Sequence, residues 1–159
     1  MRAQFFLSLF FSVFTSKLTS ESNSKFKIAF GSCGKQTHPL PIFHEVIKQN
    51  PNLFIFLGDN IYGDTHDMDV LKKKYQELGA KGSYQNLIQN TEVLATWDDH
   101  DYGQNDAGKH YPHKVESKEI FLEFCKESEH SERHRHKGVY QSVYEQTGTK
   151  VIRLIRLDN

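Results

Sequence analysis

The sequence has few cysteines, no excess of charge and, after its first residues, no long apolar run. With two cysteines, it can form at most one disulfide bond within the chain. Its 20 basic residues balance its 20 acidic ones, which argues against a nucleic-acid-binding surface, because such surfaces carry clustered lysine and arginine. Its 159 residues fit one domain.

The first 24 residues have the layout of a secretory signal peptide. Arg2 supplies a positive charge, and residues 5–14 (FFLSLFFSVF) form an apolar core that is too short to span a bilayer comfortably. Small polar residues follow this core. We therefore expect a signal peptide over residues 1–24, export to the periplasm or out of the cell, and no other membrane segment. An uncleaved anchor is the alternative.

From residue 25 onward, strand and helix patterns alternate. Residues 25–30 alternate polar and apolar side chains, as a strand does. Residues 53–57 (LFIFL) are continuously apolar, which is typical of a strand buried on both faces of a parallel sheet. The pattern predicts an α/β fold in the order β-α-β-α-α-β-α-β-β. We expect the remaining strands over 93–96, 139–144 and 150–157, and helices over 42–49, 68–78, 83–90 and 114–127.

Each of the first three predicted strands is followed by side chains that can bind a metal. Cys33 follows the first strand, Asp59, Tyr62 and Asp64 follow the second, and residues 98–106 follow the third. The carboxyl ends of parallel strands meet at the same edge of a sheet. We therefore expect these three loops to converge on one site.

The third loop, in the segment 97–106 (WDDHDYGQND), concentrates four carboxylates and a histidine. Crowded carboxylates repel one another unless a cation or protons neutralise them. A solvated turn is the alternative, because Asp, Asn and Gly also favour turns. In the metal interpretation Asp99 is a ligand, and His100 can protonate a leaving group or stabilise charge on phosphoryl oxygens. Two metals bridged by a carboxylate would clamp a phosphate ester and activate water.

Other polar residues near these loops receive weaker assignments. In the acidic segment, four residues are expected to contact the metal ligands or the substrate: Asp98, Asp101, Asn105 and Asp106. Trp97 is expected to pack beneath the loop.

Several histidines and the two cysteines complete the candidates. We expect His134 and His136 to lie in a hydrated loop. Cys33 is the functional candidate of the two cysteines, and Cys125 a small buried hydrophobe. A bridge between Cys33 and Cys125 is the alternative.

Three of these segments resemble a known family at consistent positions. Residues 30–33 (FGSC), 57–62 (LGDNIY) and 97–101 (WDDHD) are similar to the PhoD-type branch of the calcineurin-like metallophosphoesterases, also called alkaline phosphatase D-like. Residues 138–142 and 151–158 resemble the strands that follow in that family. The resemblance implies an α/β/β/α sandwich, represented here by its N-terminal β-α-β-α-β half.

The resemblance also implies roles for individual residues. Cys33 stands where this branch has a metal-ligand cysteine, and Asp59 matches the bridging aspartate. Tyr62 matches a tyrosine that ligates iron, and Asp99 matches a ligand of the second metal. His100 matches the histidine that assists transition-state stabilisation and leaving-group protonation. The implied cofactors are two or more metal ions, iron together with calcium.

The resemblance implies an exported phosphoesterase that hydrolyses phosphate mono- or diesters. The family domain, expected over residues 25–159, continues in relatives through an Asp-Thr-Arg segment and later histidine motifs. Here Asp158 matches the first residue of that segment, so we expect the C-terminal half of the domain, and part of the ligand set, to be missing. The alternative is therefore an inactive remnant that binds a metal or a partner without turnover.

Overall fold

The computed structural model describes residues 25–158 as two sheets and a layer of helices. Strands β1 (Ile28–Gly31), β2 (Leu53–Leu57) and β3 (Glu92–Thr96) form a parallel sheet in the order β1-β2-β3, and β4 (Gln141–Thr147) and β5 (Lys150–Arg156) form an antiparallel hairpin. The helices are α1 (Ile42–Lys48), α2 (Met68–Ala80), α3 (Gly82–Asn90), α4 (Asp99–Tyr102) and α5 (Lys114–Phe124), with a 3₁₀ turn, η1 (Glu132–His134). The predicted signal peptide, residues 1–24, lies outside the described residues.

The central strand β2 forms because its apolar side chains are covered on the helical side of the sheet. It pairs in parallel with β1 and β3, with Phe54 opposite Val93 in the register. Phe43 of α1 packs edge-on against Phe54 and Phe56, at ring-centroid distances of 6.1 and 5.7 Å. Such edge-to-face pairs add to the stabilisation from burial. The parallel sheet predicted from the sequence is confirmed.

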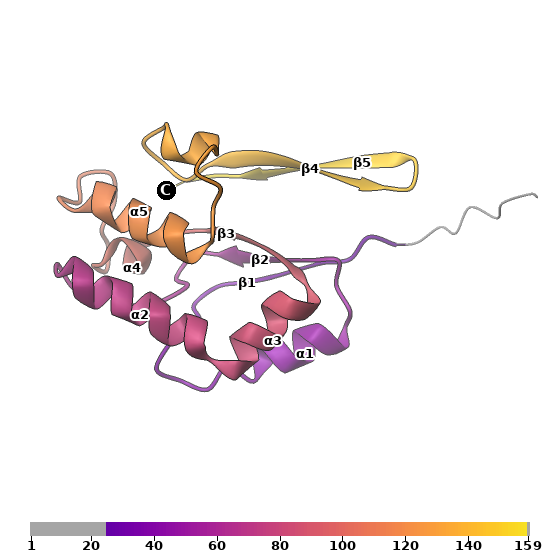
Figure 1. Ribbon diagram of the computed structural model, residues 1–159, viewed down its shortest axis with the longest axis horizontal. Coiled ribbons are helices and arrows are strands. Elements are labelled where there is room, and N and C mark those ends of the chain that lie inside the picture. Colours follow the sequence, from indigo (N-terminus) through magenta and orange to yellow (C-terminus); the bar gives the residue numbers. More distant parts are fainter. Residues whose placement is uncertain (1–24, 159) are drawn as a thin grey trace, which may run out of the picture.

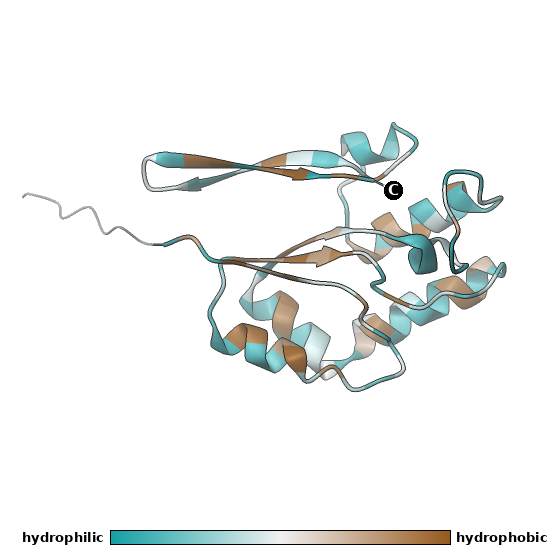
Figure 2. Ribbon diagram, turned by 180° about the vertical axis from the view of Figure 1, so that it is seen from behind, coloured by the Kyte–Doolittle hydropathy of each residue, from teal (hydrophilic) through white to brown (hydrophobic). Residues whose placement is uncertain are grey.

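Helices cover one side of the parallel sheet, and the hairpin lies on the other. Figure 1 shows α1, α2 and α3 on one side of β1–β3 and the β4–β5 hairpin on the opposite side. Figure 2 shows apolar colour along the sheet strands and a mixture of polar and apolar colour along the helices. The hairpin side is less covered, and Phe30 of β1 is 68% exposed there.

Several predicted boundaries were wrong. The first strand begins at Ile28 rather than at residue 25, and the fourth begins at Gln141 rather than at residue 139. The segment predicted as an acidic loop contains α4, because Asp98 caps a turn of helix there. Likewise, the loop predicted over 129–137 contains η1, capped by the Ser131 hydroxyl.

The cysteines are not bridged. Cys33 and Cys125 are both free, so the alternative of a disulfide between them was wrong. Cys125 is the C-terminal cap of α5, which ends at Phe124, earlier than the predicted residue 127. Burial raises the pKa of Cys125 to about 12. Within residues 25–158, no helix has the length and apolar character needed to cross a membrane.

Candidate metal centre

The loops after β1, β2 and β3 meet at the carboxyl edge of the parallel sheet, as the sequence predicts. The backbone amide of Cys33 donates to the Gly58 carbonyl (3.3 Å), and that of Gly34 donates to the Asp59 carbonyl (2.9 Å). The Cys33 thiol donates to Asp59 Oδ2 at 3.5 Å. The first two loops are therefore joined through both backbone and side chains.

Three ligand-type side chains gather at this edge. Asp59, Asp99 and His100 each place one potential ligand atom within 4.8 Å of the others, and all three are partly buried. Asp59 comes from the loop after β2, and the other two come from the start of α4. Two carboxylate oxygens and an imidazole nitrogen at this spacing form a donor set that fits a divalent or trivalent cation.

The surroundings of Asp59 favour a bound cation. Its Oδ1 atom is buried and has no hydrogen-bond partner among residues 25–158. Burial raises the pKa of Asp59, opposed by the Cys33 hydrogen bond and by His100, while the charges of Asp99 and Asp98 raise it further. A cation at this position would give Oδ1 a partner and offset the crowding of negative charge.

The backbone of the site is held in sparsely populated conformations. Cys33, Asp59, Asp64 and Asp106 all have positive φ, between 43° and 62°. For residues other than glycine this left-handed region is costly, and such strain persists only where the surrounding structure enforces it. Four residues of this kind at one sheet edge indicate that the loops are shaped for placing side chains.

Two glycines allow the second loop to approach the third. A Cβ on Gly58 would lie 2.7 Å from Asp98 Cβ, and one on Gly63 would lie 2.5 Å from the His100 carbonyl oxygen. The Gly63 amide donates to that same carbonyl at 3.1 Å. Only glycine allows this close packing of the two loops.

His100 is oriented by Asp64, a metal-binding candidate of the sequence analysis that was not predicted to pair with this histidine. Its Nδ1 lies 2.8 Å from Asp64 Oδ1, and its ring lies 4.2 Å from that of Tyr62. Because an ionised carboxylate can only accept, Nδ1 carries the proton in this pair. The pair leaves Nε2 as the ring nitrogen available for a metal or a substrate. The sequence pointed to Asp64 only through its position in the same loop as Asp59.

Tyr62 is held mainly through its backbone. The side chain of Gln36, only 2% exposed, accepts from the Tyr62 amide (2.9 Å) and donates to its carbonyl (3.2 Å). Burial raises the pKa of the Tyr62 phenol, as do a hydrogen bond with Cys33 and the nearby negative charges. A cation would therefore have to displace the phenol proton to bind it. No sequence pattern marked Gln36 as part of the site.

Asp101 stabilises the loops of the site through buried hydrogen bonds. It is fully buried and accepts hydrogen bonds from Asn60 N (3.1 Å), Tyr75 Oη (2.7 Å) and Asp98 N (3.0 Å). Burial raises the pKa of Asp101 to about 6, although these hydrogen bonds act to lower it. Asp98 in turn caps α4, accepting from the Asp99 amide at 2.9 Å. Asp101 therefore holds the second and third loops together, and Asp98 fixes the start of α4.

Asn105 and Asp106 lie exposed at the end of the acidic segment. The backbone amide of Asp106 donates to Asp99 Oδ2, and Asn105 Nδ2 donates to Asp106 Oδ2 at 2.7 Å. The contact to Asp99 therefore comes from the backbone of Asp106 and not from its side chain. Trp97 is 1% exposed and packs edge-on against Tyr102 at 4.4 Å, so it lies beneath the loop as expected.

Histidines elsewhere lie outside this cluster. His134 pairs with Glu119 at 3.4 Å, and His136 stacks on Tyr140 at 4.0 Å. Over residues 25–158, the group that could hold an ion contains neither of these histidines. Asp158, the other residue singled out by the resemblance, accepts from Trp97 Nε1.

Comparison with known proteins supports the fold. No family model and no curated protein matches the sequence. A solved structure described as "Structure of PhoD" superposes with a TM-score of 0.63 and 16% sequence identity. The match covers 74% of this chain and 28% of that chain. The chain therefore has a partial PhoD-like fold, as its sequence motifs imply, and spans about a quarter of the matched structure.

Proposed function

On the basis of this partial PhoD-like fold, we propose that the chain is part of an exported, metal-dependent phosphoesterase that hydrolyses phosphate mono- or diesters. The observation that carries the proposal is the meeting of Asp59, Asp99 and His100 at the carboxyl edge of the parallel sheet. Open α/β sheets bind ligands at this edge. The export part of the proposal rests on the signal-peptide pattern of residues 1–24.

Four residues would hold the metals. Asp59, with its unpartnered buried oxygen, would bridge two ions, and Cys33 and Tyr62 would bind one of them. Asp99 would bind the other. Thiolate and phenolate suit iron, and carboxylate oxygens suit calcium, in line with the resemblance. When bound, such a metal pair supplies a Lewis acid that polarises the phosphoryl oxygens and acidifies water.

His100 would donate a proton to the leaving group. Asp64 Oδ1 lies 2.8 Å from Nδ1 and fixes the orientation of the ring. Nε2 is then the atom that gives a proton to the departing alkoxide. Asp101 joins the second and third loops, and Gln36 joins the first and second. These contacts would keep His100 and the Asp59 carboxylate close together.

The second candidate function is metal or partner binding without turnover. The observation that favours it is the small number of ligands. Within residues 25–158, the proposed metal ligands number only four. Two metals commonly use roughly six to eight protein ligands. The four are Cys33, Asp59, Tyr62 and Asp99. A site of this kind would bind metal with lower affinity and leave charge uncompensated.

Activity measurements on the purified chain distinguish the two candidates. The chain is loaded with iron and calcium and assayed with p-nitrophenyl phosphate and bis(p-nitrophenyl) phosphate. The phosphoesterase proposal expects metal-dependent turnover that Asp59→Ala and His100→Ala each reduce about 100-fold or more. Glu77→Ala, on the exposed surface of α2, is the control and should retain full activity. Metal binding with no turnover would instead support the second candidate, and activity unchanged in His100→Ala would overturn its assigned role.

A further inference from the structure

A cavity lies away from the metal-binding residues. It has a volume of about 540 Å³ and lies between α2, α3, β3 and the end of α5. None of Cys33, Asp59, Tyr62, Asp99 or His100 lines it. Its size falls within the range of small-molecule binding sites, about 300 to 1,000 Å³. The proposed phosphoesterase function gives this cavity no role.

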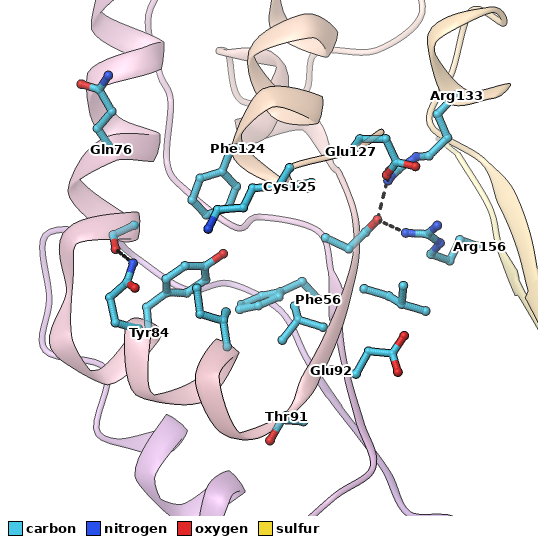
Figure 3. Close-up of a pocket in the computed structure, with 17 residues that line it drawn as sticks. Phe56, Gln76, Tyr84, Thr91, Glu92, Phe124, Cys125, Glu127, Arg133 and Arg156 are labelled. Atoms are coloured by element: carbon cyan, nitrogen blue, oxygen red, sulfur yellow. Dashed lines mark hydrogen bonds and ion pairs between the residues drawn. The ribbon is translucent and has the colours of Figure 1, made fainter. Parts of the chain in front are cut away.

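The cavity has a charged side and an aromatic side. Figure 3 shows Arg133, Arg156 and Glu127 together at one side, with the rings of Tyr84 and Phe124 at the other. The floor is also apolar, and Phe56, Ile88, Val93 and Ala95 contribute to the lining. This division resembles the layout of a site for a ligand with a polar head and an apolar body.

The positive charge at the polar side is only partly compensated. Arg133, which is fully buried, pairs with Glu127 at 2.7 Å. Arg156 is 7% exposed, and no carboxylate in residues 25–158 lies within ion-pair distance of it. Its guanidinium donates to the Ala95 carbonyl (3.0 Å) and to Gln141 Oε1. Its buried Nε atom has no hydrogen-bond partner in the described part of the chain.

The energetics of the two arginines favour a bound anion. The pKa of Arg156 is lowered to about 10, first by burial and then by the like charge of Arg133. Burial also acts on Glu127, but hydrogen bonds from Ser131 and Arg133 outweigh it and leave the pKa of Glu127 lowered. Two buried cations thus share one carboxylate. A buried charge without a counter-charge is costly, and an anion in the cavity would reduce that cost.

We propose that this cavity binds a small amphiphilic anion, with its carboxylate or phosphate group toward Arg156 and its hydrocarbon body against Tyr84, Phe124 and Ile88. Guanidinium groups are the preferred partners of carboxylates and phosphates in partly dry sites. Glu92, an exposed residue, also lines the cavity and lies below Arg156 in Figure 3, and Thr91 lies at the lower end of the lining.

Calorimetric titration of the full chain tests this site with three probes: octanoate, octanol and inorganic phosphate. Octanoate should bind at one site, at least tenfold more tightly than octanol or phosphate. Equal binding of octanoate and octanol would overturn the role of the arginines. Equal binding of octanoate and phosphate would overturn the role of the apolar wall, and no binding of octanoate would overturn the site.

Variants locate the binding. Arg156→Met should weaken octanoate binding at least tenfold, whereas Arg153→Met, an exposed arginine of the same strand, should leave it unchanged. Ile88→Trp keeps both arginines and fills the cavity, so it should abolish binding even if Arg156→Met does not fold. Asp59→Asn should bind octanoate normally, which separates this site from the metal centre. Unchanged binding in Ile88→Trp would overturn the proposal.

Discussion

Replacing Asp101 with alanine should destabilise the fold and loosen the metal centre together. The Asp101 carboxylate is 0% exposed and accepts from five donors: Asn60 N and Nδ2, Ile61 N, Asp98 N and the Tyr75 hydroxyl. Four of these distances lie between 2.7 and 3.1 Å, and the contact from Ile61 is longer, at 3.4 Å. The carboxylate therefore joins the loop after β2 to the start of α4.

The expected magnitude follows from these contacts. A buried donor that loses its acceptor costs about 1–3 kcal/mol, and such costs are not additive. Removing the carboxylate also relieves its own desolvation, which offsets part of these costs, so the net loss for Asp101→Ala is about 3–5 kcal/mol. Asp101→Asn keeps one accepting oxygen but turns an amide toward backbone donors, and should cost about 1–3 kcal/mol.

Urea unfolding followed by circular dichroism measures the change, with Glu77→Ala on the exposed face of α2 as the matched control. The unfolding midpoint should fall for both Asp101 variants and stay constant for the control. The same variants should bind metal more weakly, because the loops that carry Asp59 and Asp99 are no longer held together by the Asp101 carboxylate. A loss of less than about 1 kcal/mol for Asp101→Ala would refute the reasoning.

Three further predictions concern backbone packing, pH and thiol reactivity. Gly63→Ala should cost about 1–3 kcal/mol by urea unfolding, because the new Cβ meets the His100 carbonyl oxygen; an unchanged midpoint would contradict this packing. The lowered pKa of Glu127, in which hydrogen bonds outweigh burial, stabilises the fold above its ordinary pKa of 4.5. That stability should be lost as pH falls below 4.5, and Glu127→Gln should flatten the pH dependence of the melting temperature in this range. Iodoacetamide should label exposed Cys33 well before Cys125, whose pKa burial raises to about 12, as peptide mass mapping would show; equal labelling rates would contradict this.

The fold and the position of the site follow from local sequence patterns. The run 53–57 is apolar throughout, so its burial in a parallel sheet could be predicted without knowing its neighbours. The residues after each strand could then be placed at one edge, because parallel strands share that edge. For this reason Cys33, Asp59 and Asp99 could be brought together from sequence alone.

The supporting contacts could not be predicted in this way. Gln36 and Asp64 act through hydrogen bonds to partners 26 and 36 residues away, and no periodicity encodes such pairs. Asp101 was predicted to support the ligands or contact the substrate, but the sequence did not show that Asn60 and Tyr75 lie against its buried carboxylate. The helix α4 was missed because a single turn capped by Asp98 is too short to show a helical period.

The central claim is that Asp59, Tyr62 and their neighbours form a metal centre, and titration with ferric iron tests it most directly. A phenolate bound to ferric iron gives a visible charge-transfer band. The account predicts that this band appears as iron is added, disappears in Tyr62→Phe and in Asp59→Ala, and persists in Tyr144→Phe, an exposed tyrosine of the hairpin. A chain that binds no iron, or whose band is unchanged in Tyr62→Phe, would contradict the account.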